Sequence, residues 1–150
     1  MAIQEADVVW KGGLQFDGHA LNETIHLDSH LDGYSQGTGP KRLLLVALAG
    51  CTAMDVASML PKMRVPFTSF KVRAIGDTAD EHPKIYKTMH VIYEIDTDPE
   101  YLPKVEMAIQ KSREKYCGVH AMLEKAGTIT HEVLLTKSGV HKIEEVHPED

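Results

Sequence analysis

The chain has 150 residues, a formal net charge of −6 and no cluster of lysines or arginines. This length predicts a single domain over residues 1–139, large enough to fold without a disulfide or metal, followed by a polar tail over residues 140–150. The acidic balance argues against a nucleic-acid partner, which requires a basic face. The N-terminus lacks a secretory signal, and the longest uninterrupted apolar stretch, residues 43–49, is too short to span a membrane. We therefore expect a cytoplasmic protein without a membrane partner.

Short strands and tight turns dominate the N-terminal part of the chain. Apolar residues alternate over residues 6–11, and two further runs cover residues 14–17 and 23–28, with Gly12-Gly13 and Asp17-Gly18 as turn signals. This pattern predicts an antiparallel meander. The segment that follows, residues 32–39, holds three glycines and reads as a loop.

A helix is predicted from Pro40 to about Leu60. Proline is favoured in a first helical turn, where its missing N–H has no partner to lose. The first ten residues are apolar nearly all round, whereas a surface helix carries one apolar stripe. We therefore expect this helix to be covered on more than one side.

The remainder of the chain predicts strands at residues 68–75 and 84–96, helices at 103–116 and 118–127, and a last strand at 129–135. The predicted order is a group of strands, a central helix, and then strands and helices mixed. This order indicates the α+β class rather than a doubly wound parallel sheet.

Two cysteines, Cys51 and Cys117, carry the chemistry that the sequence offers. A cysteine pair in a reducing compartment is more often catalytic or redox-sensing than a structural bridge, although a free cysteine also serves as a small core residue. Cys51 lies about 16 Å into its helix, beyond the reach of the helix dipole. Asp55, one turn on, opposes ionisation of Cys51, and Lys41 and Arg42 lie roughly 14 Å back along the helix.

Cys117 is placed differently, at the start of its predicted helix. Backbone N–H groups there favour a thiolate, so local physics predicts Cys117 as the more acidic thiol. His120 completes a C-x-x-H pair, but the other histidines show no ligand spacing, so we expect no metal and no cofactor. We interpret His120 as a residue at the solvent edge of its helix and Asp55 as an ordinary helix acid.

Three stretches of the sequence resemble the OsmC/Ohr family of thiol-dependent peroxide-detoxifying proteins, in its OsmC-like branch. They are GPKRLLLVALAGCTAMDVASMLPKMR, EHPKIYKTMHVIYEI and VEMAIQKSREKYCGV. The resemblance implies an intertwined α+β homodimer, with antiparallel sheets around central buried helices that carry the cysteines. It also implies Cys51 as the peroxidatic thiol and Cys117 as the resolving thiol.

The function implied is reduction of organic hydroperoxides through a sulfenic acid and a disulfide, with a dithiol or lipoyl-type reductant closing the cycle. We expect the apolar walls of the substrate pocket to come from Leu48, Met54, Val119 and Met122. Two alternatives stay open. One is a non-catalytic dimer that binds an apolar ligand or senses oxidant, and the other is metal binding through Cys117 and His120.

The sequence departs from the family at the residues that usually assist the peroxidatic thiol. Family members carry an acid just after the helix-start proline and an arginine in the N-terminal region. Here Lys41 and Arg42 follow Pro40, and no arginine precedes Arg42. The candidate assisting residues are therefore Arg42, Lys41, Asp55 and His120.

Overall fold

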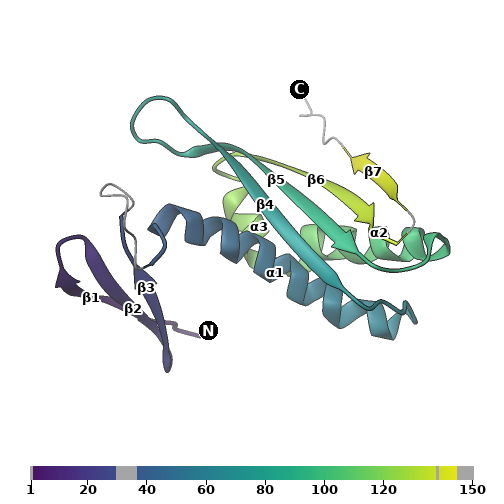
Figure 1. Ribbon diagram of the computed structural model, residues 1–150, viewed down its shortest axis with the longest axis horizontal. Coiled ribbons are helices and arrows are strands. Elements are labelled where there is room, and N and C mark those ends of the chain that lie inside the picture. Colours follow the sequence, from purple (N-terminus) through teal and green to yellow (C-terminus); the bar gives the residue numbers. More distant parts are fainter. Residues whose placement is uncertain (1, 30–36, 138, 145–150) are drawn as a thin grey trace. The chain divides into compact units, whose positions relative to one another are not determined.

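The computed structural model describes residues 2–29, 37–137 and 139–144 (Figure 1). The chain forms two compact units, residues 1–44 and residues 45–150, and each is described by itself. The boundary between them lies within the first helix. A single domain over residues 1–139 stays a prediction, and most of the predicted loop over residues 32–39 lies outside the described residues.

The first unit contains the predicted meander. Strands β1 (Ala6–Gly12), β2 (Gln15–Ala20) and β3 (Glu23–Leu27) form an antiparallel sheet in that order. Gly12 and Gly13, with φ of 118° and 55°, make the first turn in conformations that side chains disfavour. The antiparallel meander and its Gly12-Gly13 turn are therefore confirmed. The turn predicted at Asp17-Gly18 is wrong, because both residues lie inside β2 and the second turn falls at residues 21–22.

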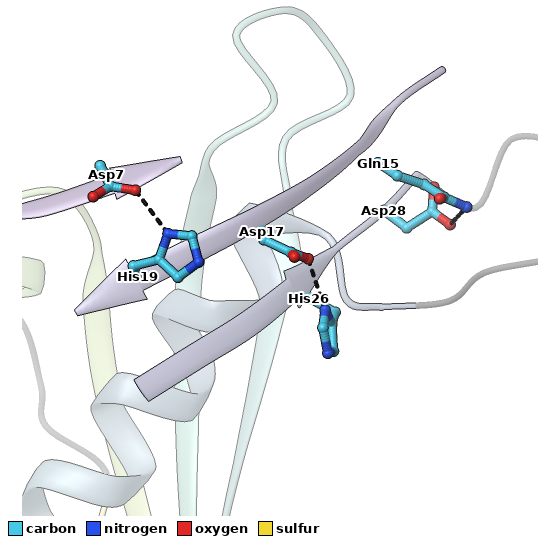
Figure 2. A network of polar contacts seen from close by, with 6 residues as sticks. All are labelled: Asp7, Gln15, Asp17, His19, His26 and Asp28. Carbon is cyan, nitrogen blue, oxygen red and sulfur yellow. Dashed lines mark hydrogen bonds and ion pairs between the residues drawn. The ribbon is translucent and has the colours of Figure 1, made fainter. Parts of the chain in front are cut away.

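Polar pairs link neighbouring strands of this sheet, as Figure 2 shows. Imidazole Nδ1 atoms lie 2.8 Å from carboxylate oxygens in the pairs His19–Asp7 and His26–Asp17. The hydrogen bond from His26 lowers the pKa of Asp17. Large apolar side chains, Trp10 among them, remain exposed, and none of the described residues of this unit belongs to the buried apolar core. Backbone and polar contacts therefore hold a sheet whose apolar side chains are uncovered.

The second unit is built on a four-stranded sheet. Strands β4 (Phe70–Thr78), β5 (Tyr86–Ile95), β6 (Thr128–Leu135) and β7 (Val140–Glu144) lie side by side in that order. The β4–β5 and β6–β7 pairs are antiparallel, whereas β5 and β6 are parallel. The mixed α+β class is confirmed. The loose tail expected from residue 140 is wrong for β7, whose backbone pairs with β6 despite its polar sequence.

The helices connect and cover this sheet. Helix α1 (Pro40–Lys62) precedes β4, and the crossover from β5 to β6 contains a short 3₁₀ turn (Pro99–Tyr101), α2 (Leu102–Lys111), a π-helical turn (Ser112–Tyr116) and α3 (Gly118–Leu123). A parallel pair requires such a long crossover. The helix predicted over residues 103–116 is found as α2, with a π-helical turn in place of its last residues. One core combines α1, α2 and the sheet, and its fully buried members include Leu48, Val56, Tyr93, Ile95 and Val105.

Helix α1 has one face in this core, and described side chains on another face are exposed. Val46 and Met54 are 64% and 75% exposed. By length and composition alone α1 is apolar enough to cross a membrane. Its most apolar 18-residue stretch has a mean hydropathy of 2.0, and 22% of that stretch is buried. Thr52 and Asp55, however, hydrogen-bond with residues of other elements. The second unit covers α1 on one side, and cover on a further side stays a prediction.

We predict that Gly127→Ala destabilises the second unit. A Cβ at Gly127 would lie 2.7 Å from the carbonyl oxygens of Tyr86 and Lys87, which are backbone atoms at the start of β5. Such overpacking typically costs about 1–3 kcal/mol. Thermal unfolding followed by circular dichroism measures the effect. The control is Gly118→Ala, where a Cβ meets nothing within 4 Å, and equal melting temperatures for the two variants would contradict the prediction.

Candidate functional site

Both cysteines and Asp55 meet in the second unit. Cys51 and Asp55 lie four residues apart on α1, and Cys117 lies between the π turn and α3. One ligand atom from each of the three residues lies within 4.8 Å of the other two. Both thiols are free, with Cys51 half-buried and Cys117 buried. The structure thus brings together the two residues that the sequence singled out, although their individual roles remain predictions.

The π turn positions Cys117. Its backbone N–H donates to the carbonyl of Ser112 at 2.7 Å, a bond that closes the turn. The chain is then extended at Cys117, and α3 begins at the next residue. The Cys117 Sγ accepts a hydrogen bond from the backbone N–H of His120 at 3.3 Å. Isolated π turns of this kind often occur at functional sites.

A chain of hydroxyl groups supports Asp55 from inside the core. Ser112 Oγ lies 2.8 Å from Asp55 Oδ2 and 2.9 Å from Thr52 Oγ1, which lies 2.8 Å from the hydroxyl of Tyr93. Each hydroxyl has one proton and an ionised carboxylate only accepts. Ser112 Oγ is placed to donate to Thr52 and to Asp55, and with one proton it serves one of these acceptors at a time.

Electrostatics in the cluster favour the protonated form of Cys117. Burial, its hydrogen bond with Cys51 and the nearby Asp55 raise the pKa of the Cys117 thiol to about 12, against a smaller opposing contribution from the backbone N–H of His120. The expectation that the start of α3 makes Cys117 an acidic thiol is therefore wrong. The N-terminus of α3 contributes one hydrogen bond to the sulfur, and desolvation outweighs it.

His120 and Arg113 border the cluster. His120 is buried, which corrects the prediction of a residue at the solvent edge, and burial together with the positive charge of Arg113 lowers its pKa. Its Nδ1 lies 3.5 Å from Glu124 Oε2. The charge of Arg113 also acts to lower the pKa of Tyr93, although burial raises that pKa overall to about 12. Arg113 is thus a cation close to the hydroxyl chain.

Sequence reasoning did not identify Ser112, Thr52, Tyr93 or Arg113 as parts of the site. One signal was present, because Ser112 falls on the apolar stripe of its predicted helix, where a polar residue must find a buried partner. Nothing in the local sequence indicates which partner.

The remaining predicted site residues are not members of the three-residue cluster. Lys41 and Arg42 occupy the first turn of α1 in the other compact unit. Of the predicted pocket residues, Leu48 is fully buried in the core, Met54 and Met122 are exposed, and Val119 packs against the core. None of these four lines the cavity of about 430 Å³ beside Asp55, which is formed by Asp55, Ser58, Met59, Lys62, Met63, Lys111 and Tyr116. A pocket walled by these four stays a prediction.

Among the residues that the structure describes, the group able to hold a metal ion consists of Cys51, Asp55 and Cys117. His120 is not part of it, so the C-x-x-H pair read from the sequence does not form a ligand set. Two thiols and a carboxylate suit a thiophilic divalent ion, and they are also the groups that a thiol redox reaction requires.

Comparison with known proteins agrees with this architecture. The family model of the OsmC-like proteins matches residues 33–132. The chain belongs to the OsmC-like family. The protein YhfA of Escherichia coli strain K12 is 33% identical over 129 residues, which cover 85% of this chain and 94% of YhfA.

Solved structures of other proteins share the fold. A protein from Aquifex aeolicus VF5 is 25% identical, with a TM-score of 0.79 over 91% of this chain and 98% of that protein. The organic hydroperoxide resistance protein OhrB of Bacillus subtilis is 14% identical, with a TM-score of 0.63 over 88% of this chain and 99% of OhrB. At that identity the likeness to OhrB concerns the fold alone.

We predict that alkylating reagents modify Cys51 well before Cys117 at neutral pH. Cys117 is 3% exposed, and its raised pKa keeps it protonated until the pH approaches 12, so its reactive thiolate is scarce below that value. A time course of iodoacetamide labelling, read by peptide mass spectrometry in native buffer and in urea, measures both rates. Equal rates in native buffer, or faster labelling of Cys117, would contradict the prediction.

Proposed function

We propose that the protein is a thiol-dependent peroxidase that reduces organic hydroperoxides with Cys51 and Cys117. The observation that carries the proposal is the cluster of two free thiols and a carboxylate within 4.8 Å of one another. Membership of the OsmC-like family supports it. The half-buried Cys51 is reachable from solvent, whereas Cys117 is buried and protonated, so we assign the first step to Cys51.

In the first step the thiolate of Cys51 attacks the outer peroxide oxygen. A sulfur–oxygen bond forms, the oxygen–oxygen bond breaks, and the alkoxide leaves as an alcohol after taking a proton. Cys51 becomes a sulfenic acid and the hydroperoxide has gained two electrons.

In the second step the sulfur of Cys117 attacks the sulfur of the sulfenic acid. A disulfide forms and the hydroxyl group leaves as water. Asp55 is placed to relay the Cys117 proton to this leaving group, because one of its oxygens is held by Ser112 and the carboxylate lies within reach of both sulfurs. A dithiol or lipoyl-type reductant then restores both thiols by exchange.

The assisting groups of this proposal differ from the family arrangement. Asp55 takes the place of the acid that usually follows the helix-start proline. Arg113 supplies positive charge from the π turn, where it already influences Tyr93 and His120. Arg42 and Lys41 are about nine and ten helical residues before Cys51, roughly 14 Å along an ideal helix. We therefore regard them as secondary candidates.

We also propose that the chain works as a homodimer in the cytoplasm. The uncovered apolar residues of α1, such as Val46 and Met54, and those of β1, such as Trp10, expose more apolar surface than isolated soluble chains usually leave in water. A second copy with the same surfaces would cover them through a two-fold interface. A reducing compartment keeps the thiols ready for the next cycle.

A non-catalytic dimer that binds an apolar ligand is the second candidate. A cavity of about 350 Å³ between α1 and β4 supports it, because its lining carries no charged side chain: Leu45, Val46, Ala49, Gly50, Ala53, Val72 and Ala74. Absence of turnover with every peroxide tested would favour this function over the first.

We predict that Cys51→Ser abolishes hydroperoxide turnover, whereas Cys117→Ser permits one reaction per chain and leaves a sulfenic acid on Cys51. The reason is that only Cys51 attacks the peroxide in the proposed cycle. Cumene hydroperoxide consumption under excess dithiothreitol and dimedone labelling read by mass spectrometry measure the two outcomes. Dimedone on Cys117 of the Cys51→Ser variant at the parent rate would reverse the assigned roles.

We predict a particle mass of twice the 16.7 kDa chain in light scattering at low micromolar concentration. Met54→Lys should shift the protein toward monomer, because it places a charge in the uncovered face of α1. The matched control is Met107→Lys on α2, where the methionine is also exposed. A stable monomer for the parent protein would refute the dimer.

A further inference from the structure

The three side chains of the thiol cluster are spaced as ligands of one metal ion. The Sγ atoms of Cys51 and Cys117 and a carboxylate oxygen of Asp55 lie within 4.8 Å of one another. Three atoms so placed all lie within about 2.8 Å of a common point, and Zn–S and Zn–O bonds are about 2.3 and 2.1 Å long. Shifts of less than about 1 Å would therefore bring all three atoms to bonding distance of one ion.

The three ligands come from two segments that are tied together. Cys51 and Asp55 lie four residues apart on α1 and therefore share one face of a regular helix. Cys117 is the extended residue between the π turn and α3. The hydroxyl of Ser112, in the π turn, hydrogen-bonds with residues of α1. The spacing of the cluster thus rests on contacts other than a metal ion.

Hydrogen bonds also orient two of the three ligands. Ser112 Oγ lies 2.8 Å from Asp55 Oδ2, and the backbone N–H of His120 donates to Cys117 Sγ at 3.3 Å. Contacts of this kind fix the orientation of metal ligands and raise metal affinity. Two thiolates and a carboxylate around a divalent ion carry one net negative charge. The positive charge of Arg113, which acts on the neighbouring His120, offsets part of it.

The cluster can be reached from solvent. Cys51 and Asp55 are both half-buried, and Asp55 lines the cavity of about 430 Å³ at the end of α2. A metal site needs such an entry path. An ion with three protein ligands also keeps a fourth position for water or another small ligand.

We propose that the reduced cluster binds one thiophilic divalent ion of the zinc class through Cys51, Asp55 and Cys117. Two thiolates and one carboxylate favour Zn²⁺ over Mg²⁺ and Ca²⁺, which prefer oxygen ligands. Binding forms two metal–sulfur bonds, releases the two thiol protons to solvent and transfers no electron.

The site goes beyond the proposed function and does not require it. A bound ion occupies the sulfur lone pairs that would attack a peroxide, and a disulfide between Cys51 and Cys117 would remove both sulfur ligands. Metal binding and the proposed peroxidase cycle therefore exclude each other. The ion defines an inhibited state that protects the reduced thiols.

The first test titrates the reduced, chelator-treated protein with Co²⁺, a spectroscopic substitute for Zn²⁺. One equivalent per chain should produce thiolate-to-cobalt charge-transfer absorption and the d–d bands of a tetrahedral site, and Zn²⁺ should remove both. Cys51→Ser and Cys117→Ser should each lower the charge-transfer band. Asp55→Asn should keep that band but weaken Co²⁺ binding about tenfold or more.

The matched control for Asp55→Asn is Asp80→Asn, which removes the same charge from an exposed position outside the cluster. It should bind Co²⁺ as the parent does, and an equal loss of affinity would overturn the role of Asp55. Equal Co²⁺ binding by the parent and by Cys51→Ser would assign the ion to adventitious sites such as surface histidines and would overturn the proposal.

Zinc protection tests the site in the parent protein, without any substitution. Saturating Zn²⁺ should slow iodoacetamide labelling of Cys51 several-fold, and a chelator should restore the rate. An unchanged labelling rate would overturn the proposal, as would Co²⁺ spectra without a thiolate band.

Single-turnover reduction of cumene hydroperoxide by the prereduced protein separates this inference from the proposed function. A cobalt–thiolate spectrum from a protein that reduces no hydroperoxide would support the metal site while the peroxidase function fails. Turnover that saturating Zn²⁺ leaves unchanged would overturn the metal site while the peroxidase function stands. Where both hold, inhibition by Zn²⁺ should follow the occupancy measured by the absorption bands.

Discussion

The buried hydroxyl of Ser112 is the contact on which the geometry of the thiol cluster depends. It joins the π turn to α1 through two hydrogen bonds, one to Asp55 and one to Thr52. A buried polar group without a partner costs about 1–3 kcal/mol, so the hydroxyl, the carboxylate and the turn constrain one another. The same turn places the Cys117 N–H against the Ser112 carbonyl. A polar contact therefore ties the segment that carries Cys117 to the helix that carries Cys51, and Ser112 and Thr52 are both buried where it forms.

Burial also decides which thiol keeps its proton. The start of α3 offers Cys117 a backbone N–H, and in an exposed setting this would favour the thiolate. Here α3 has six residues, so its dipole is short, and the sulfur is desolvated beside Asp55. The pKa of Cys117 rises to about 12 because these effects outweigh the hydrogen bond. In the proposed cycle Cys117 stays protonated until Cys51, which is nearer to solvent, has reacted with the peroxide.

Local patterns in the sequence predicted the parts of the fold that depend on neighbouring residues. The Gly12-Gly13 turn of the meander, the start of α1 at Pro40 and a strand at β5 all appear in the structure. The turn expected at Asp17-Gly18 does not, because the strand continues through it. The pairing of β5 with β6 and of β6 with β7 depends on residues far apart in the chain, and no local signal predicts it. The site follows the same division. Cys51, Asp55 and Cys117 were identified from the sequence and its family resemblance, whereas Ser112 and Arg113 became visible once the π turn replaced a regular helical turn.

The missing acid and arginine of the family pattern do not leave the cluster without charged neighbours. An acid one helical turn from Cys51 lies on the same face of α1, and Asp55 meets that condition one turn after Cys51 rather than at the start of the helix. A carboxylate so close raises the cost of forming a thiolate, so a cation nearby has a clear electrostatic use. Arg113 is such a cation, and it follows Ser112 directly in the chain. The five-residue π turn thus supplies both the Ser112 hydroxyl that orients Asp55 and the positive charge of Arg113 that offsets the charge of Asp55. The proposed chemistry therefore depends on a local departure from regular α-helix.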